Sequence, residues 1–216
     1  MKENEQKILV AGVDGSKGGW VCVSGNLNSN DNTKFDIFNH FEEIIEKKFS
    51  LILVDMPIGL DEKLIKGGRV VDREARGMLL KNKSSIFNPP SRLALTAKDY
   101  QEANKINKDQ GIKNRPEIFE SHPELVFQVM KGGAIETKKN TQEGLKERID
   151  ILKENGFDKE FIEKFINKKN SFYKNDDFID SCSLFWSAKR VVKNNEIQIP
   201  NEIIRDVKGI IMQMKI

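Results

Sequence analysis

Residues 7–24 read KILVAGVDGSKGGWVCVS, and this stretch contains two apolar runs separated by glycines. The first run, residues 7–14, is rich in β-branched side chains and stops at Gly15, which is typical of a buried strand. The second run, residues 20–24, predicts another strand, and the glycines between the two runs predict a tight turn. We therefore expect a two-stranded hairpin, followed by a third strand at residues 33–38.

A further apolar segment, LILV at residues 51–54, shows no alternation of polar and apolar side chains. Such a run suits a central strand that is covered on both faces, as the strands of parallel sheets are. Asp55 and Pro57 end it, and another short strand is expected at residues 118–121. Because strands lead and helices interleave later, the predicted class is α/β with a mixed sheet, to which residues 209–216 would add an edge strand. The spacing of apolar side chains predicts helices at residues 41–48, 72–80, 123–130, 141–156, 161–166 and 176–193.

The composition indicates a single globular domain over residues 1–216. Hydrophobic residues make up 38% of the chain and charged residues 32%, which leaves enough apolar side chains for a core and excludes a wholly disordered protein. No stretch approaches the roughly 20 apolar residues that a transmembrane helix needs. The polar N-terminus has no export signal, and Cys22 and Cys182 stand far apart, so we expect a cytoplasmic protein with two reduced core thiols.

Four aspartates stand where predicted buried elements end or begin. Asp14 ends the first strand, and Asp55 follows the LILV run. Asp177 and Asp180 are three residues apart near the start of the last helix, so they project from about the same face. The carboxyl ends of neighbouring strands in an open α/β sheet form the usual ligand crevice, where converging carboxylates repel one another. Mg²⁺ or Mn²⁺ would neutralise them, and two such ions can clamp the oxygens of a phosphoryl transfer.

Each of these aspartates also has a purely structural interpretation. An Asp between a strand and a glycine is often only a turn former, which would account for Asp14. Asp55 can simply terminate its strand. Asp176 and Asp177 suit the first turn of a helix, where the helix dipole favours negative charge. Asp180 is harder to explain in this way, because it lies a turn inside an apolar helix.

The segment ESHPE at residues 120–124 places two carboxylates around an imidazole, directly after a predicted strand. Glu120 and His122 would then supply a further metal ligand or a general base. The alternative is a histidine satisfied by nearby backbone groups, beside two solvated glutamates. His40 is the only other histidine, so no multi-histidine zinc site is available.

Three arginines are candidates for phosphate contacts. Arg73 and Arg76 are about one helical turn apart and Arg92 follows a proline-rich loop, an arrangement that suits bidentate binding of phosphate. The alternative is a solvated helix face that pairs with Asp72 and Glu74. The net charge of +3, from 36 basic and 33 acidic side chains, is compatible with a nucleic-acid partner but too weak to predict one.

Several separate segments between about residues 9 and 192 form an ordered set: GVDGSKGGWV, DMPIGL, RVVDREAR, SSIFNPPSR, ESHPELVF, KKNTQEGLKER and DDFIDSCSLFWSAKR. This set resembles the DUF429 family, whose members are predicted to be ribonuclease H-like nucleases. The resemblance implies a mixed five-stranded sheet, with three antiparallel strands followed by parallel ones, flanked by helices and carrying helical insertions. The chain departs from the family in one place, because only about residues 104–116 stand where family members have a longer helical stretch, and this shortening bears on substrate choice and activity.

The resemblance also implies roles for individual residues. The acidic residues of the first strand, the fourth strand and the last helix would hold the metal ions, and the family's HPE motif would complete the site. The metal ligands on this basis are Asp14, Asp55, Asp177 and Asp180, and the motif contributes Glu120 and His122.

The preferred function is a Mg²⁺- or Mn²⁺-dependent nuclease that hydrolyses phosphodiester bonds, with Arg73, Arg76 and Arg92 on the phosphate backbone of DNA or RNA. A second hypothesis is an ATP phosphotransferase of the actin-like or sugar-kinase type, in which residues 14–16 would face the phosphates of ATP. That fold normally needs two such domains, so this chain would have to dimerise. A third is a catalytically silent binding protein that keeps the fold. None of the three predicts a membrane partner.

Overall fold

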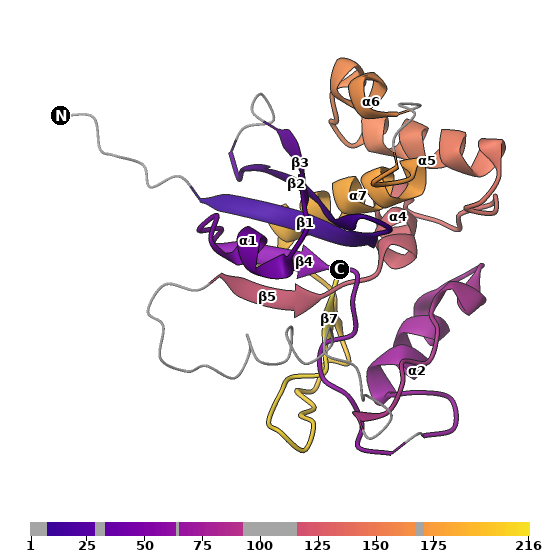
Figure 1. Cartoon of the computed structure of the whole chain (residues 1–216). Helices are drawn as coiled ribbons and strands as arrows, with labels where there is room; N and C mark the ends of the chain where they lie inside the picture. Colours follow the sequence, from indigo (N-terminus) through magenta and orange to yellow (C-terminus); the bar gives the residue numbers. More distant parts are fainter. Residues whose placement is uncertain (1–7, 29–32, 64, 93–115, 167–170) are drawn as a thin grey trace.

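The computed structural model describes residues 8–28, 33–63, 65–92, 116–166 and 171–216 (Figure 1). The strands in these residues form one seven-stranded sheet in the order β3-β2-β1-β4-β5-β7-β6. Apart from Pro116, the shortened segment at residues 104–116 lies outside the described residues. The strands are β1 (Leu9–Ser16), β2 (Gly19–Asn26), β3 (Lys34–Phe38), β4 (Leu51–Val54), β5 (Glu117–Glu120), β6 (Gln198–Ile199) and β7 (Met214–Lys215).

The first two strands form the predicted hairpin. Ser16 pairs with Gly19 across the turn, and Gly19 has a φ of 132°, a conformation that glycine adopts without steric cost. β3 pairs with β2 in the antiparallel sense, whereas β4 lies parallel to β1, with Val13 opposite Val54, and β5 lies parallel to β4. The predicted α/β class with a mixed sheet is therefore confirmed. The order β3-β2-β1-β4-β5 is consistent with the ribonuclease H-like fold.

The sheet extends beyond β5 by two strands of two residues each. The apolar run at residues 209–216 predicts an edge strand, but only Met214–Lys215 is in strand conformation, and β7 lies between β5 and β6. The edge is formed by β6, which pairs with β7 in the antiparallel sense. Two residues carry almost no periodic signal, which explains why the extent and order of these strands do not follow from the sequence.

Each of the six predicted helical segments contains a helix, and these helices cover both faces of the sheet. Figure 1 shows α1 on one face and α7, α4 and α5 on the other. Among the described residues, no helix combines the length and the apolar composition needed to cross a membrane. Within the described residues the helices are α1 (Phe41–Ile45), α2 (Val70–Met78), α4 (Pro123–Lys131), α5 (Gln142–Glu154), α6 (Lys159–Phe165) and α7 (Asn175–Val192), and Lys83–Ser85 forms a 3₁₀ turn.

The apolar core is divided between the two faces by the alternation of side chains along the strands. Val10 of β1 belongs to the larger core, which packs under α4, α5 and α7. Ala11 and Val13 point to the opposite face, where α1 closes a smaller core. Cys22 and Cys182 are free and buried, one in each core, as predicted for reduced core thiols.

Helix α7 lies unusually close to β1, and a glycine makes this approach possible. A Cβ atom at Gly12 would come within 2.1 Å of the Phe185 backbone nitrogen and 2.4 Å of the Ser181 carbonyl oxygen. Real Cβ contacts are never so short, so only glycine fits here. The backbones of α7 and β1 are thereby in direct contact, which places the first two turns of α7 beside the carboxyl end of β1.

Candidate metal centre

Three aspartates from three separate elements converge at the carboxyl ends of the central strands. Asp14 lies near the end of β1, Asp55 follows β4 directly, and Asp180 lies in the second turn of α7. Each offers a carboxylate oxygen, and these three oxygens lie within 4.8 Å of one another. Asp14 and Asp180 are buried, with 8% and 0% of their surface exposed, and Asp55 is partly buried.

The strand pairing explains why Asp14 and Asp55 are neighbours. Val13 and Val54 are paired in parallel strands, so the residue after each one lies at the same edge of the sheet. The ladder continues past the end of β4, because the Asp55 amide donates a hydrogen bond of 3.0 Å to the Val13 carbonyl. The Asp14 carboxylate accepts a hydrogen bond of 2.8 Å from the amide of Gly15. Asp180 is added by the close packing of α7 on β1.

The electrostatics of the cluster oppose ionisation of all three carboxyl groups. Burial, together with the charges of Asp180 and Asp55, raises the pKa of Asp14 to about 10. Burial raises the pKa of Asp55 to about 6 and that of Asp180 to about 7, although the nearby positive charge of Lys139 works in the other direction. Negative charges this close together repel one another and so raise the pKa of each carboxyl group. A cation bound among them would lower these pKa values instead.

Lys139 is the positive group that faces this cluster. Its ammonium group forms an ion pair with Asp180 Oδ2 and lies 4.0 Å from Asp176 Oδ2. Although burial opposes its charge, the neighbouring carboxylates, first of all Asp180, raise the pKa of Lys139 above its usual value. The residue lies in the loop before α5, and the sequence offers only one signal for its role, the KKN stretch of a motif quoted above.

The residues present fit a hard divalent cation. Three carboxylates supply only oxygen ligands, which is the donor set that Mg²⁺ and Mn²⁺ prefer. Asp180 Oδ1 is buried and has no hydrogen-bond partner among the described residues, which is unusual for a buried carboxylate oxygen. A cation bound between Asp14, Asp55 and Asp180 would satisfy this oxygen and offset the repulsion.

Asp177, the fourth predicted ligand, lies outside this group of three. Its Oδ2 accepts a hydrogen bond of 2.9 Å from the amide of Lys174, and this contact caps the start of α7. The carboxyl group is about half buried, and burial raises its pKa. In this position Asp177 has the structural role that its place in a first helical turn suggests.

Glu120 is buried in an ion-pair network next to the centre. Arg69 donates to both of its oxygens and also to both oxygens of Asp72. The same guanidinium donates to the carbonyls of Ile58 and Gly59, and Glu120 accepts from the amide of Ile58 at 2.7 Å. This network holds the loop after Asp55 in place.

His122 and Glu124 are also engaged with neighbouring groups. His122 Nε2 lies 3.3 Å from the carbonyl oxygen of Ser85, which can only accept, so Nε2 carries the proton and Nδ1 is an acceptor. Burial lowers the pKa of His122 to about 4, so the imidazole is neutral at neutral pH. Glu124 is bound by the guanidinium of Arg148, which has 0% of its surface exposed and ties α5 to α4.

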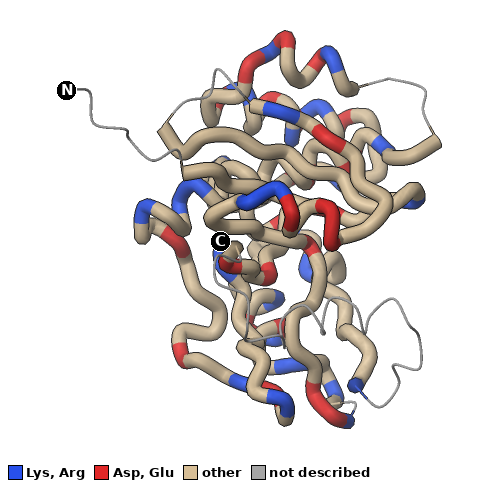
Figure 2. Tube along the Cα trace, turned by 60° about the vertical axis from the view of Figure 1, so that its left-hand side comes forward, with Lys and Arg blue, Asp and Glu red and all other residues tan. Residues whose placement is uncertain are grey.

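The three arginines proposed for phosphate contacts have local partners. Arg73 donates to the carbonyl of Gly68 and Arg76 to that of Gly67, so both lie against the loop before α2. Arg92 forms an ion pair with Asp206. Basic and acidic residues are both scattered along the trace seen in Figure 2, in keeping with the small net charge.

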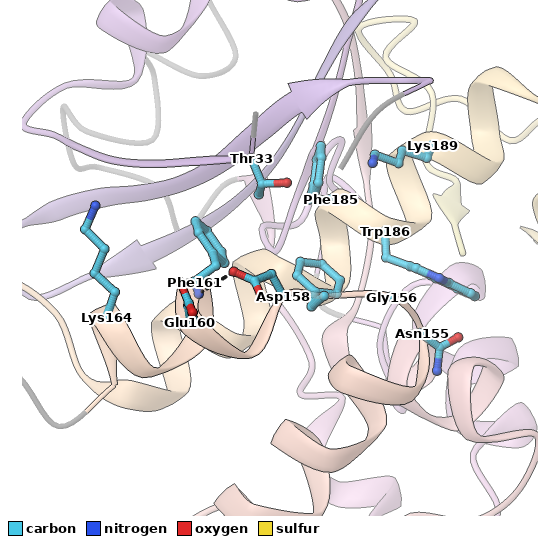
Figure 3. Close-up of a pocket in the computed structure, with 11 residues that line it drawn as sticks. Thr33, Asn155, Gly156, Asp158, Glu160, Phe161, Lys164, Phe185, Trp186 and Lys189 are labelled. Carbon is cyan, nitrogen blue, oxygen red and sulfur yellow. Dashed lines mark hydrogen bonds between the residues drawn. The ribbon is translucent and has the colours of Figure 1, made fainter. Parts of the chain in front are cut away.

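Figure 3 shows a cavity of about 720 Å³ with the residues that line it. Its walls come from Thr33, which directly precedes β3, from the segment that joins α5 to α6, from α6 itself and from the second half of α7. Phe157, Phe161, Phe185 and Trp186 give it an aromatic lining. The three clustered aspartates do not contribute to this lining.

Comparison with known proteins finds a match to one protein family. A family model described as "Protein of unknown function (DUF429)" matches residues 12–116 and 108–204. Together the two matches include all three clustered aspartates, Lys139 and the ESHPE segment. No curated protein and no solved structure matches the chain significantly.

Proposed function

The chain belongs to the DUF429 family, and on that premise we propose that it is a divalent-metal-dependent nuclease, a hydrolase of phosphodiester bonds. Asp14, Asp55 and Asp180 would hold the metal, Mg²⁺ or Mn²⁺. The observation that carries the proposal is the convergence of three carboxylates, within 4.8 Å, on a place where one buried oxygen of Asp180 has no hydrogen-bond partner among the described residues. The order of the strands, which agrees with a ribonuclease H-like fold, supports it.

The metal, when bound, would lower the pKa of a coordinated water and polarise a phosphoryl oxygen. The chain's own residues prepare the site. Asp14 and Asp55 stand on paired strands and Asp180 on a helix in backbone contact with one of them, so the geometry of the ligands is set before a substrate arrives. Burial of the carboxylates limits the access of water to them and strengthens their electrostatic interaction with a bound cation.

Neighbouring residues would position the metal ligands. Glu120 and Arg69 together fix the loop that follows Asp55, and we assign them this role because both oxygens of Glu120 are already engaged. Nδ1 of His122 has no hydrogen-bond partner within the described part of the chain, so this residue remains the candidate to accept a proton in this region. Nucleic acid is the proposed substrate class, with Arg73, Arg76 and Arg92 as the predicted contacts to its backbone.

The proposal is tested by incubating the protein with labelled single-stranded DNA, duplex DNA, RNA and a small chromogenic phosphodiester, with Mn²⁺ or Mg²⁺ or with a chelator. We expect cleavage of at least one substrate that depends on the metal. Asp14→Asn and Asp180→Asn should each reduce it by about 100-fold or more, because loss of a ligand costs at least as much as loss of its supporting residues.

Asp150→Asn is the matched control, since Asp150 is an exposed aspartate on α5 whose ion pair with Lys153 is long, at 3.9 Å. Its activity should equal that of the wild type. Full activity of Asp14→Asn would remove the metal centre from the mechanism. Metal binding without cleavage of any substrate would favour the silent binding protein.

A further inference from the structure

Lys139 is held in a fixed position although it lies in a loop. The preceding carbonyl, of Lys138, accepts hydrogen bonds from the amide and the hydroxyl group of Thr141. Thr141 in turn caps α5 through Gly144, where a Cβ would come within 1.9 Å of the Lys138 carbonyl oxygen. Because this turn is packed against the start of α5, the Lys139 side chain extends from a rigid base.

The ammonium group occupies a place where a cation is expected. It contacts Asp180 Oδ2 and stands 4.0 Å from Asp176 Oδ2, so it pairs with two acidic residues that are one turn apart on α7. Asp180 has 0% of its side-chain surface exposed, whereas Lys139 keeps 38%. The lysine therefore closes the cluster on its solvent side, where a substrate would approach.

The charges of the cluster balance with one divalent ion. Asp14, Asp55 and Asp180 carry three negative charges when ionised, and Lys139 offsets one of them; Asp176, 4.0 Å from the same ammonium group, lies outside the group of three carboxylates and is not counted here. A single divalent cation bound to the three carboxylates, including Asp180 Oδ1, for which the described residues offer no hydrogen-bond partner, brings the sum for these four side chains and the ion to zero. A second divalent ion would have to compete with Lys139 for Asp180 Oδ2, and it would bring the sum for these four side chains and two ions to +2.

We infer that Lys139 takes the place of a second metal ion, so that the centre binds one divalent cation and one permanent ammonium group. This inference rests on the proposed metal-dependent function and specifies its stoichiometry. Lys139 would donate a hydrogen bond to a non-bridging oxygen of the phosphodiester, as a second metal would otherwise do by coordination. A lysine supplies this charge without competition from free ions in solution.

The inference is tested by counting Mn²⁺ ions bound per chain, using isothermal titration together with electron paramagnetic resonance of the loaded protein. The wild type should bind one ion and give the spectrum of an isolated Mn²⁺. Lys139→Met should bind two and show spin coupling between them, a doubling of bound metal. Lys139→Arg keeps the charge and should bind one. Lys138→Met is the matched control from the neighbouring exposed lysine, and it should behave as the wild type does.

The outcomes separate this inference from the proposed function. Two coupled ions in the wild type would overturn the role of Lys139 and leave the metal centre in place. One ion in folded Lys139→Met, checked by circular dichroism with Mn²⁺ present, would overturn it as well. No bound ion in the wild type would overturn the metal centre itself, and the inference with it.

Discussion

Asp14 is an acid whose surroundings oppose its ionisation. The Gly15 amide stabilises the charged form by one hydrogen bond, whereas burial and the charges of Asp180, Asp55 and Asp177 destabilise it. Without a cation, the folded chain therefore retains a proton on Asp14 that the unfolded chain would release. The centre thus lowers the stability of the metal-free protein at neutral and alkaline pH, which is a common property of functional sites.

This leads to a prediction about pH. The pKa values of Asp55, Asp180 and Asp14 in the folded protein, about 6, 7 and 10, all lie above the ordinary 3.8. Groups raised in this way contribute stability that is fully present below about pH 4 and is lost as the pH rises through the folded values. The melting temperature of the metal-free protein should accordingly fall on the alkaline side, and Mn²⁺ should restore it more strongly there.

Asp14→Asn isolates this effect. The amide oxygen can still accept from Gly15, but one of the buried charges is gone, so the melting temperature with chelator present should fall less steeply than that of the wild type between about pH 5 and pH 9. Thermal denaturation followed by circular dichroism measures both curves. Parallel curves for the two proteins would show that the pKa of Asp14 is not raised in the folded protein.

The clustered aspartates could be predicted from the sequence because each occupies a place with a local signal. Asp14 and Asp55 follow apolar runs that become neighbouring strands, and Asp180 interrupts an apolar helix face. Lys139 could not be predicted, because it lies in a polar loop and reaches the centre only through the packing of α5. Asp177 is a near neighbour of Asp180, and sequence spacing alone does not show that its carboxylate caps the helix.

The ESHPE segment gives a similar lesson. Its position after a strand is predicted correctly, and the segment does lie beside the central strands. The partner of Glu120 is Arg69, 51 residues earlier in the chain, and no local pattern indicates an ion pair across that separation. Tertiary contacts therefore decide whether a carboxylate such as that of Glu120 is held in an ion pair or is available to a ligand.

At the scale of elements, the centre depends on the contact between α7 and β1. Asp180 comes near Asp14 only because Gly12 lets the two backbones touch. Gly12→Ala should force α7 outward, so that the unfolding free energy falls by about 1–3 kcal/mol or more, as for overpacked cores. Because the shift would separate two of the ligands, the affinity for Mn²⁺ should fall too. Urea denaturation and isothermal titration measure the two effects.

Gly77→Ala provides the comparison. Gly77 lies in α2, where an added Cβ would meet nothing within 4 Å, so this substitution should be neutral or stabilise the protein by up to about 1 kcal/mol. Its metal affinity should remain that of the wild type. If Gly12→Ala bound Mn²⁺ as tightly as Gly77→Ala does, the position of α7 would not control the centre.

The elements themselves were predictable where apolar periodicity is long enough. The hairpin, the LILV strand and α7 follow from runs of four residues or more, and all are present. β6 and β7 were not predictable in extent or order, because each has two paired residues whose conformation depends on the strand beside it.

At the scale of the whole molecule, both apolar cores rest on the same sheet. Ala11 and Val13 face one core and Val10 the other, so melting of β1 would expose both. We therefore expect a single cooperative unfolding transition in calorimetry, with calorimetric and van't Hoff enthalpies that agree. Saturating Mn²⁺ should move the whole transition upward. Two separate transitions would contradict a single domain.

The continued ladder beyond β4 has a further use. The amide proton of Asp55 is bonded to Val13 inside the sheet, although its side chain belongs to the centre. Such a proton should exchange with deuterium only on extensive opening of the fold, and so give a persistent nuclear magnetic resonance signal. That signal would shift on addition of Mg²⁺ and be broadened by paramagnetic Mn²⁺. The Asp55 amide would thus report both the occupancy of the metal centre and the opening of the sheet.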